Sequence, residues 1–424
     1  MEMDFQLKRG RGTETFSLED SRILQVILPP ETNLRPCTLR DVEEALDSPV
    51  GTPPLLELLQ RKQPRKIVLI VNDITRPTPY DLLLPPVLSR FARAGITDDM
   101  VTLLVATGIH DPHTDDQNLQ VYGEEIVRRF GIVSHAADDL ESLVSIGTLS
   151  TGAELKINRL VAEADFVLSL GVVMPHYFAG YSGGRKSILP GVAWKETVER
   201  NHSRMVELMD ALPELDSNPV NLEMIEAAQM VGVDFILNVV VNEKKDVVKV
   251  AAGDVVKAWR EAVAVSASLY EVPVEGLADV AVAGACGHPR DINMYQAQKA
   301  LDHADKATKK GGAIVLVADC PGGYGEAVFE EWMNAASCPE DIVKRIRSDF
   351  KMGGHKAFGF AKVATEKTVY MVTSMDGAEV KKLFAVKVPS VEEALRLIEQ
   401  ERGKDLSYMV LPEGSLTVPV PPRE

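Results

Sequence analysis

The stretch of sequence that decides the fold covers residues 165–203 and reads DFVLSLGVVMPHYFAGYSGGRKSILPGVAWKETVERNHS. Its first nine residues, 165–173, are mostly apolar and rich in β-branched side chains, which predicts a buried strand. A glycine-rich loop with His, Lys, Arg and Tyr side chains follows, and a helical stretch begins near Trp194. Ligands bind beyond the carboxyl ends of strands in α/β sheets, so we expect the chemistry in this loop.

One interpretation of the loop is a phosphate cradle. Gly183 and Gly184 would let backbone N–H groups approach an anion, while Arg185 and Lys186 would add positive charge. A P-loop needs glycine immediately before its lysine, and Arg185 stands there instead, which argues against a true P-loop.

A second interpretation is a metal site, because His176 and His202 could each offer a neutral imidazole. Their spacing fits neither a pair on one helix turn nor a standard zinc pattern, so this signal alone is weak. The third interpretation is structural: the glycines make turns, and the histidines are ordinary core or surface groups. The clustering of so many polar groups on one loop favours a functional role.

Two earlier strands are predicted to end in polar loops in the same way. Residues 66–71 lead into Asp73 and Arg76, and residues 101–106 lead into His110, as residues 165–173 lead into His176. Strands that alternate with helices favour a parallel sheet covered by helices. All three loops should therefore open at one edge of that sheet.

A second α/β unit is predicted to begin with the strand at residues 278–284. A helix from about Asn293 places Tyr295, Gln296 and Lys299 on one face, although a solvated helix surface would give the same spacing. We therefore predict an α/β fold of two α/β domains with mostly parallel sheets. The expected division is 1–273, 274–406, and a tail at 407–424 that returns to the N-terminal domain.

Composition limits the class of protein. The 424 residues are 45% hydrophobic and 25% charged, which is ordinary for a globular enzyme of two or three domains. The formal net charge of −16 argues against nucleic-acid or anionic-membrane binding, but not against a small anionic substrate. Four cysteines without a CxxC pair, and no leader or membrane-spanning run, predict a cytoplasmic protein. The sequence leaves open whether the protein forms a homo-oligomer.

Five blocks in this order resemble one family: NDITRPTP at 72–79, TGIH at 107–110, PHYFAGYSGGRKSILPG at 175–191, ERNHS at 199–203 and YQAQK at 295–299. Together they resemble the nickel-pincer-nucleotide-dependent lactate racemases and their homologues, over nearly the whole chain. The resemblance implies a larger N-terminal and a smaller C-terminal α/β domain, with the active site in the interdomain cleft. It also implies that cofactor-biosynthesis enzymes are partners.

The resemblance implies a role for each matching residue. Lys186 would hold the cofactor, a nickel pyridinium-3-thioamide-5-thiocarboxylic acid mononucleotide, through a thioamide, and His202 would bind the nickel. His110 and His176 would be the two acid/base groups beside the substrate. The remaining matches are substrate groups (Arg76, Tyr295, Gln296, Lys299) and groups beside the cofactor (Asp73, Thr75, Gly183, Gly184).

The chemistry explains why these residue types are needed. The C–H bond of a 2-hydroxy acid is too weakly acidic for a side-chain base, so the cofactor would carry the hydride. One imidazole would take the hydroxyl proton, and a second would serve the opposite face of the planar keto acid. A fork-like cation such as Arg76 would hold the carboxylate while the keto group turns over.

The sequence departs from the lactate-specific pattern at two places. Asp111 follows the first histidine where those members tend to have arginine, and residues 351–360 (KMGGHKAFGF) offer no match for their late tryptophan. A larger or more polar 2-hydroxy acid, or a sugar acid, therefore fits as well as lactate. His113 and His355 are candidate substrate contacts, with solvated loop histidines as the simpler interpretation.

Two other functions stay open from the sequence. A 2-hydroxy acid oxidoreductase with a diffusible nicotinamide cofactor is disfavoured, because no GxGxxG follows an early strand. A non-enzymatic protein that binds a nickel nucleotide would keep Lys186 and His202 but would need neither His110 nor His176.

Overall fold

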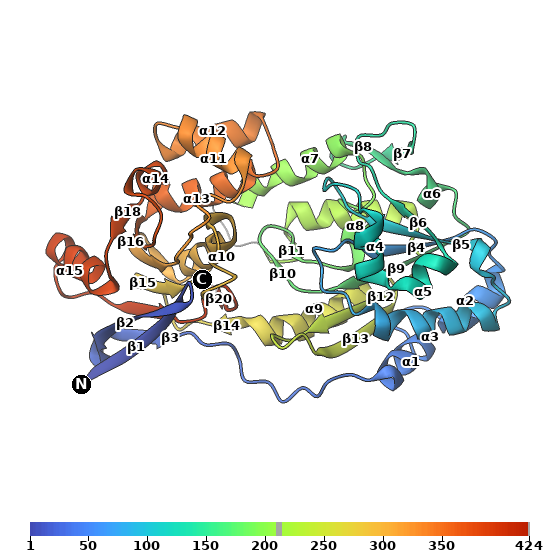
Figure 1. Ribbon diagram of the computed structural model, residues 1–424, viewed down its shortest axis with the longest axis horizontal. Helices are drawn as coiled ribbons and strands as arrows, with labels where there is room; N and C mark the ends of the chain where they lie inside the picture. The colour runs from blue at the N-terminus through green and yellow to red at the C-terminus, as the bar shows by residue number, and fades with distance from the viewer. Residues whose placement is uncertain (209–213, 423–424) are drawn as a thin grey trace. The chain divides into compact units, whose positions relative to one another are not determined.

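The computed structural model describes residues 1–208 and 214–422 (Figure 1). The chain forms two compact units. One consists of Asn33–Ala267 and is called here the central unit. The other combines Met1–Thr32 with Ser268–Glu424 and is called here the terminal unit.

The central unit is built on a six-stranded sheet of order β13-β12-β9-β4-β5-β6. All neighbouring strands are parallel except β12 and β13, which are antiparallel. The strands are β4 (Ile67–Asn72), β5 (Val101–Ala106), β6 (Gly131–Ser134), β9 (Phe166–Val172), β12 (Phe235–Val241) and β13 (Val247–Gly253). Every residue of β9 and β12 is buried, as expected for strands covered on both faces.

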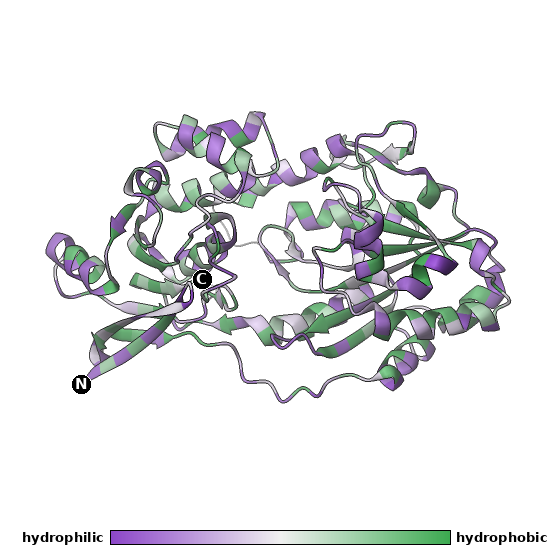
Figure 2. Cartoon of the chain, viewed as in Figure 1, coloured by the Kyte–Doolittle hydropathy of each residue, from purple (hydrophilic) through white to green (hydrophobic). Residues whose placement is uncertain are grey.

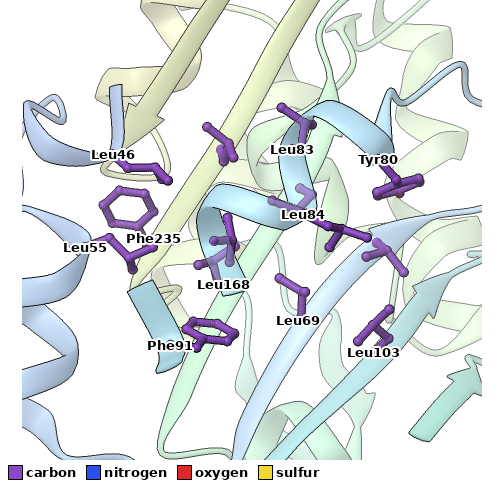
Figure 3. Close-up of a cluster of buried hydrophobic side chains, with 14 of the residues drawn as sticks. Leu46, Leu55, Leu69, Tyr80, Leu83, Leu84, Phe91, Leu103, Leu168 and Phe235 are labelled. Atoms are coloured by element: carbon purple, nitrogen blue, oxygen red, sulfur yellow. The ribbon is translucent and has the colours of Figure 1, made fainter. Parts of the chain in front are cut away.

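One face of this sheet packs against helices α1 (Leu39–Asp47), α2 (Leu55–Lys62) and α3 (Tyr80–Arg93). Figure 3 shows Leu83, Leu84 and Phe91 of α3 beside Leu69, Leu103 and Leu168 of the strands. The same strands are mainly apolar in Figure 2, while the covering helices carry polar residues. This apolar layer supports the strand ends from which the polar loops emerge.

The central unit contains further helices and two small antiparallel strand pairs. The helices are α4 (Asp115–Tyr122), α5 (Glu124–Arg129), α6 (Arg159–Ala162), α7 (Lys195–Ser203), α8 (Pro219–Val231) and α9 (Lys257–Tyr270), the last of which continues into the terminal unit. Two small antiparallel pairs join β7 (Leu143–Thr148) to β8 (Glu154–Asn158) and β10 (Pro175–His176) to β11 (Gly180–Tyr181). Helix α7 begins after Trp194, as predicted.

The terminal unit contains a second six-stranded sheet, of order β18-β17-β16-β15-β19-β3, in which all neighbours are parallel. Its strands are β3 (Ile23–Val26), β15 (Ala278–Gly284), β16 (Thr308–Val317), β17 (Thr368–Val372), β18 (Val386–Val388) and β19 (Tyr408–Leu411). Its helices are α10 (Met294–Lys306), α11 (Ala327–Ala335), α12 (Pro339–Ser348), α13 (Gly354–Glu366), α14 (Gly377–Lys382) and α15 (Val391–Arg402). A hairpin of β1 (Glu2–Arg9) and β2 (Gly12–Glu19), and a pair of β14 (Glu271–Pro273) with β20 (Val418–Val420), complete it.

The α/β class and the mostly parallel sheets agree with the sequence prediction. The predicted boundaries differ from the observed units at both ends of the chain. Residues 1–32 belong with the C-terminal part, because β3 adds to the edge of its sheet beside β19. The tail also stays in the terminal unit, because β19 pairs with β15 inside that sheet.

Two further features concern the whole chain. Across residues 1–208 and 214–422, no helix is both long and apolar enough to span a membrane. All four cysteines are free thiols.

Candidate active site

The polar loops of the central unit emerge at one edge of its sheet. The strands β9, β4 and β5 are neighbours in that order and run parallel, so their carboxyl ends point the same way. The predicted convergence of the three loops is therefore confirmed (Figure 1). The β4 loop lies in the middle, with the loops of β9 and β5 on either side.

His110 is held by a carboxylate of the β4 loop. Its Nδ1 lies 2.7 Å from Oδ2 of Asp73, which is buried, while the imidazole itself is 45% exposed. The Asp73 carboxylate accepts a hydrogen bond from Nδ1–H, so Nε2 of the neutral ring is left as the basic nitrogen. This pairing orients His110 as a proton acceptor toward solvent or substrate.

Asp73 is stabilised as an anion. Burial raises the pKa of its carboxyl, but hydrogen bonds from His110 and Thr75, with the charges of His110 and Arg76, outweigh burial and lower it overall. Thr75 donates to Asp73 Oδ1 from both its backbone N–H, at 3.1 Å, and its hydroxyl, at 2.5 Å. The resemblance implies that Asp73 and Thr75 lie beside the cofactor; in the structure Asp73 also holds His110, and Thr75 holds Asp73.

His176 lies in the tight β10–β11 hairpin, where it pairs with Gly180. Its Nε2 is 2.9 Å from Lys186 Nζ, and its Nδ1 accepts a long 3.4 Å hydrogen bond from the Ala179 N–H. With Nδ1 as the acceptor, the ring proton sits on Nε2 and faces the lysine. The motif's second histidine and its lysine therefore form a direct pair.

Both members of this pair are driven toward their neutral forms. Burial, followed by the charge of Lys186, lowers the pKa of His176 well below its usual range. Burial, followed by the charge of Arg76, does the same to Lys186. Since Arg76 acts on both groups and on Asp73, the β4 loop lies within electrostatic range of the lysine. A neutral amine is the nucleophilic form that covalent attachment requires.

His202 is buried near the end of α7, with 3% of its surface exposed. Its Nδ1 lies 3.1 Å from Asn201 Oδ1, and Asn201 is held in turn by Glu223 Oε2 at 2.7 Å. The Phe178 ring packs edge-on against both His176 and His202, with centroids 4.8 Å apart in each case. The lysine, the two imidazoles and this phenylalanine therefore form one cluster.

The glycine-rich loop is shaped by close packing. Gly183 and Gly184 have φ of +77° and +52°, which L side chains rarely adopt. A Cβ on Gly183 would meet Val173 at 2.6 Å, and one on Gly184 would meet Trp259 at 2.7 Å. The two glycines let the chain pass close to the sheet and turn Lys186 toward His176.

Arg185 has a structural role. Its side chain is completely buried, stacks 3.8 Å from the Trp259 ring centroid, and donates to the carbonyls of Ala179 and Tyr181 and to Asn221. The guanidinium N–H groups therefore already donate to acceptors inside the protein. The interpretation of Arg185 as a phosphate ligand is wrong.

Sequence reasoning missed Asn238, a polar residue within the buried strand β12. Its Oδ1 accepts from the Gly184 N–H at 2.8 Å, and its buried Nδ2 has no hydrogen-bond partner within the described part of the chain. An asparagine inside the apolar run FILNVVV was the available signal, because a buried amide needs partners.

The histidines left open by the sequence have structural partners. His113 Nε2 accepts a hydrogen bond from the Ile74 N–H at 2.9 Å, and its Nδ1 lies 3.1 Å from Asn118 Oδ1. His113 therefore stabilises the β4 loop. His355 lies in the terminal unit, on α13, and its Nδ1 accepts from the Gly353 N–H. Tyr295, Gln296 and Lys299 also belong to the terminal unit, on α10.

The described residues contain no group of three or more His, Cys, Asp or Glu side chains placed to hold a metal ion. A metal at His202 would therefore take most of its ligands from a bound molecule. This donor set fits a metal carried by an organic cofactor, and the lowered pKa of the buried Lys186 fits the attachment of that cofactor.

Comparison with known proteins assigns the chain to a family. Residues 9–211 match the lactate racemase N-terminal domain, and residues 274–419 match the lactate racemase C-terminal domain. The lactate racemase of Thermoanaerobacterium thermosaccharolyticum is 32% identical over 421 residues, covering 97% of this chain and 98% of that protein. The lactate racemase of Lactiplantibacillus plantarum is 33% identical over 380 residues, 88% of this chain and 89% of that protein.

Solved structures agree as well. The lactate racemase apoprotein from T. thermosaccharolyticum superposes with a TM-score of 0.87 at 31% identity, covering 99% of this chain and all of that one. A protein from Thermotoga maritima, at 20% identity and a TM-score of 0.64 over 91% of this chain and 99% of that one, shares the fold alone. The chain belongs to the lactate racemase family, and it is an isomerase of the racemase type.

Proposed function

We propose that this protein racemises a 2-hydroxy acid, lactate or a related and larger one, by reversible hydride transfer with two histidines as acid/base groups. One observation carries the proposal. In the sheet, β4, which leads to Arg76, lies between β9, which leads to His176, and β5, which leads to His110. Two bases on opposite sides of a carboxylate-binding cation are what inversion at C2 requires.

His110 would take the hydroxyl proton of one enantiomer at Nε2. Asp73, hydrogen-bonded to Nδ1, would stabilise the imidazolium that forms and hold the ring in place. His176 would take the hydroxyl proton of the other enantiomer in the tautomer that leaves its Nε2 unprotonated. The lowered pKa of His176 favours its neutral, proton-accepting form.

Arg76 would hold the substrate carboxylate through its planar fork, which fixes C2 while the keto group turns over. We propose a substrate role for Tyr295, Gln296 and Lys299 of the terminal unit on the strength of the resemblance. Lys299 would add a second positive charge for the carboxylate.

The residues fit the proposed nickel-pincer nucleotide. When bound, it would supply a reversible hydride acceptor and its own nickel ligands. Lys186 would attach it covalently, His202 would provide the protein's imidazole ligand, and the backbone at Gly183 and Gly184 would border it. The cofactor has to come from its biosynthetic enzymes, which we propose as partners in the cytoplasm.

The test is a screen of enantiopure 2-hydroxy acids with cofactor-loaded protein, read by chiral chromatography without added NAD. We expect each accepted enantiomer to relax to a mixture. His110→Asn and His176→Asn should each lower the rate by about 10²- to 10⁴-fold and leave bound nickel unchanged. His288→Asn, at an exposed histidine of the terminal unit, is the matched control and should keep the wild-type rate.

Two outcomes would contradict the proposal. A net change that consumes NAD would indicate an oxidoreductase. Nickel-loaded protein that turns over no 2-hydroxy acid would indicate a carrier.

A further inference from the structure

His135 is a buried histidine that the proposed reaction does not use. It lies directly after β6, and none of its surface is exposed. Its backbone N–H donates to the Val105 carbonyl at 3.0 Å, and its own carbonyl accepts from the Thr107 hydroxyl at 2.7 Å. The Thr107 carbonyl accepts in turn from the His110 N–H at 3.0 Å. The backbone of His135 therefore holds the turn that carries His110.

The side chain of His135 reaches a different segment. Its Nε2 lies 2.9 Å from the Ala193 carbonyl oxygen, and its Nδ1 lies 3.3 Å from Nδ2 of the buried Asn158. A carbonyl oxygen only accepts, so Nε2 carries the proton and Nδ1 accepts from the Asn158 amide. This amide is correctly oriented, because its Oδ1 accepts from the Leu160 N–H at 3.0 Å. Burial lowers the pKa of His135, which favours this neutral form of the ring.

Ala193 lies on the connection between the two residues proposed to hold the cofactor. Residues 188–194 join the turn of Lys186 to α7, on which His202 lies. The Gly191 N–H donates to the Lys186 carbonyl at 3.0 Å, so this connection is tied to the turn. A hydrogen bond to Ala193 therefore acts on the segment that links Lys186 to His202.

The loop of His110 and this connection are joined at two places within the central unit. The Gly108 N–H donates directly to the Gly191 carbonyl at 3.0 Å. The second link passes through His135, whose backbone holds the loop and whose ring holds Ala193. Two links fix the relative orientation of the segments, whereas one link alone leaves a rotation free. A site needs this support, because a displacement of about 1 Å can cost about 10²-fold in rate.

We propose that His135 is a positioning residue, whose imidazole fixes the separation between His110 and the cofactor attached at Lys186. The inference rests on the proposed function, in which His110 accepts the hydroxyl proton of a substrate that faces the cofactor. The hydroxyl and the C2 hydrogen belong to the same small molecule, so the groups that receive them must keep one separation. His135 acts through Thr107 and Ala193 and needs no contact with the substrate.

Two variants of His135 in the cofactor-loaded enzyme test this role. His135→Leu removes both hydrogen bonds of the ring, whereas His135→Gln keeps an N–H donor for Ala193 and an acceptor for Asn158. We expect His135→Leu to lower kcat per bound nickel by about 10- to 100-fold and to change KM by less than about 2-fold. His135→Gln should recover most of the lost kcat.

Arg90→Met is the matched control for a general loss of stability. Arg90 is a buried residue of α3 that donates to Asp47, far along the chain from these hydrogen bonds. Its replacement should lower the unfolding temperature and leave kcat per bound nickel unchanged. If His135→Leu fails to fold, Thr107→Val removes only the hydroxyl that donates to His135 and should lower kcat about 10-fold.

Hydrogen exchange in the apoprotein, read by mass spectrometry, provides a measurement that needs neither cofactor nor turnover. Peptides that cover residues 107–113 and 188–194 contain amides bonded within this network, including those of Gly108 and Gly191. They should exchange faster in His135→Leu than in the wild type. The rates should return toward the wild-type values in His135→Gln and stay unchanged in Arg90→Met.

The positioning role and the proposed function fail in different ways. If the wild type racemises a 2-hydroxy acid and His135→Leu keeps its kcat per bound nickel, the positioning role is disproved and the function stands. Equal losses of kcat in His135→Leu and Arg90→Met would also disprove the role, because they would show an effect of stability alone. If the wild type racemises no 2-hydroxy acid while exchange at residues 107–113 and 188–194 still depends on His135, the function is disproved and the structural link stands.

Discussion

At the scale of single residues, the contact between Lys186 and His176 is the feature with the clearest chemical consequence. The 2.9 Å separation of Nζ and Nε2 brings together two groups that cannot both be protonated at low cost. Burial lowers the pKa of each, so both favour the neutral form. The lowered pKa of Lys186 favours the amine form that the proposed covalent attachment requires.

This leads to a prediction about attachment. Protein produced together with the cofactor-biosynthesis enzymes should carry a covalent adduct, and Lys186→Met should lose it completely. Lys195→Met, at an exposed lysine at the start of the neighbouring helix α7, should keep the adduct. Intact-protein mass spectrometry measures both, and an adduct retained in Lys186→Met would disprove the assignment.

The sequence could predict the roles of some site residues but not of others. His110, His176 and Lys186 could be singled out because each follows a strand end in a loop rich in polar groups. The functions of Arg185 and His113 could not be predicted, because they depend on tertiary partners: backbone carbonyls for Arg185 and the Ile74 N–H for His113. Two adjacent cations, Arg185 and Lys186, look alike in sequence but lie in different environments.

At the scale of elements, the loop 183–187 depends on glycine for its path. Gly183 combines a positive φ of +77° with close neighbours, Val173 at 2.6 Å and Asn238 Oδ1 at 2.9 Å from an added Cβ. Gly95 has a similar φ of +79°, but nothing lies within 4 Å of its added Cβ. Alanine substitution at Gly183 and at Gly95 therefore separates the free-energy cost of a positive φ from the free-energy cost of steric overlap.

We predict that Gly183→Ala lowers the free energy of unfolding of the central unit by about 3 kcal/mol, and Gly95→Ala by about 1 kcal/mol. The difference arises from the overlap with Val173 and Asn238. Denaturant unfolding followed by tryptophan fluorescence measures both variants. Equal losses would show that the loop tolerates a side chain at residue 183.

The strands that form the centres of the two sheets could be predicted, because continuous β-branched runs bounded by polar loops are a strong local signal. The predicted residues 101–106 and 278–284 coincide with β5 and β15. The membership of β3 could not be predicted. It pairs with β19, nearly four hundred residues along the chain, and no local pattern specifies a partner at that separation.

At the scale of the whole molecule, buried histidines couple stability to pH. Burial and nearby lysines, Lys306 first, lower the pKa of His303 to about 3, although a hydrogen bond to the Gly414 carbonyl opposes this. A histidine with a lowered native pKa stabilises the fold fully above its unfolded pKa of about 6.5. That contribution is lost as the pH falls from about 6.5 toward 3.

We therefore expect the terminal unit to lose stability between pH 6.5 and 4. His303→Gln keeps a donor for Gly414 but cannot be protonated. Its free energy of unfolding should fall less steeply than that of the wild type, by up to about 1.4 kcal/mol per pH unit. His288→Gln, at an exposed histidine, should keep the wild-type slope. Equal slopes for the wild type and His303→Gln would contradict the prediction.

The central claim concerns the whole reaction: the C2 hydrogen moves as hydride, while only the hydroxyl proton passes through the two histidines. Histidine-bound protons exchange with water, whereas a transferred hydride does not. The most direct measurement is racemisation of an enantiopure 2-hydroxy acid, deuterated at C2, by cofactor-loaded protein in ordinary water. We predict that the opposite enantiomer forms with its deuterium retained. Its replacement by solvent hydrogen, at the rate of racemisation, would show that the C–H bond is broken by a base and would contradict this account.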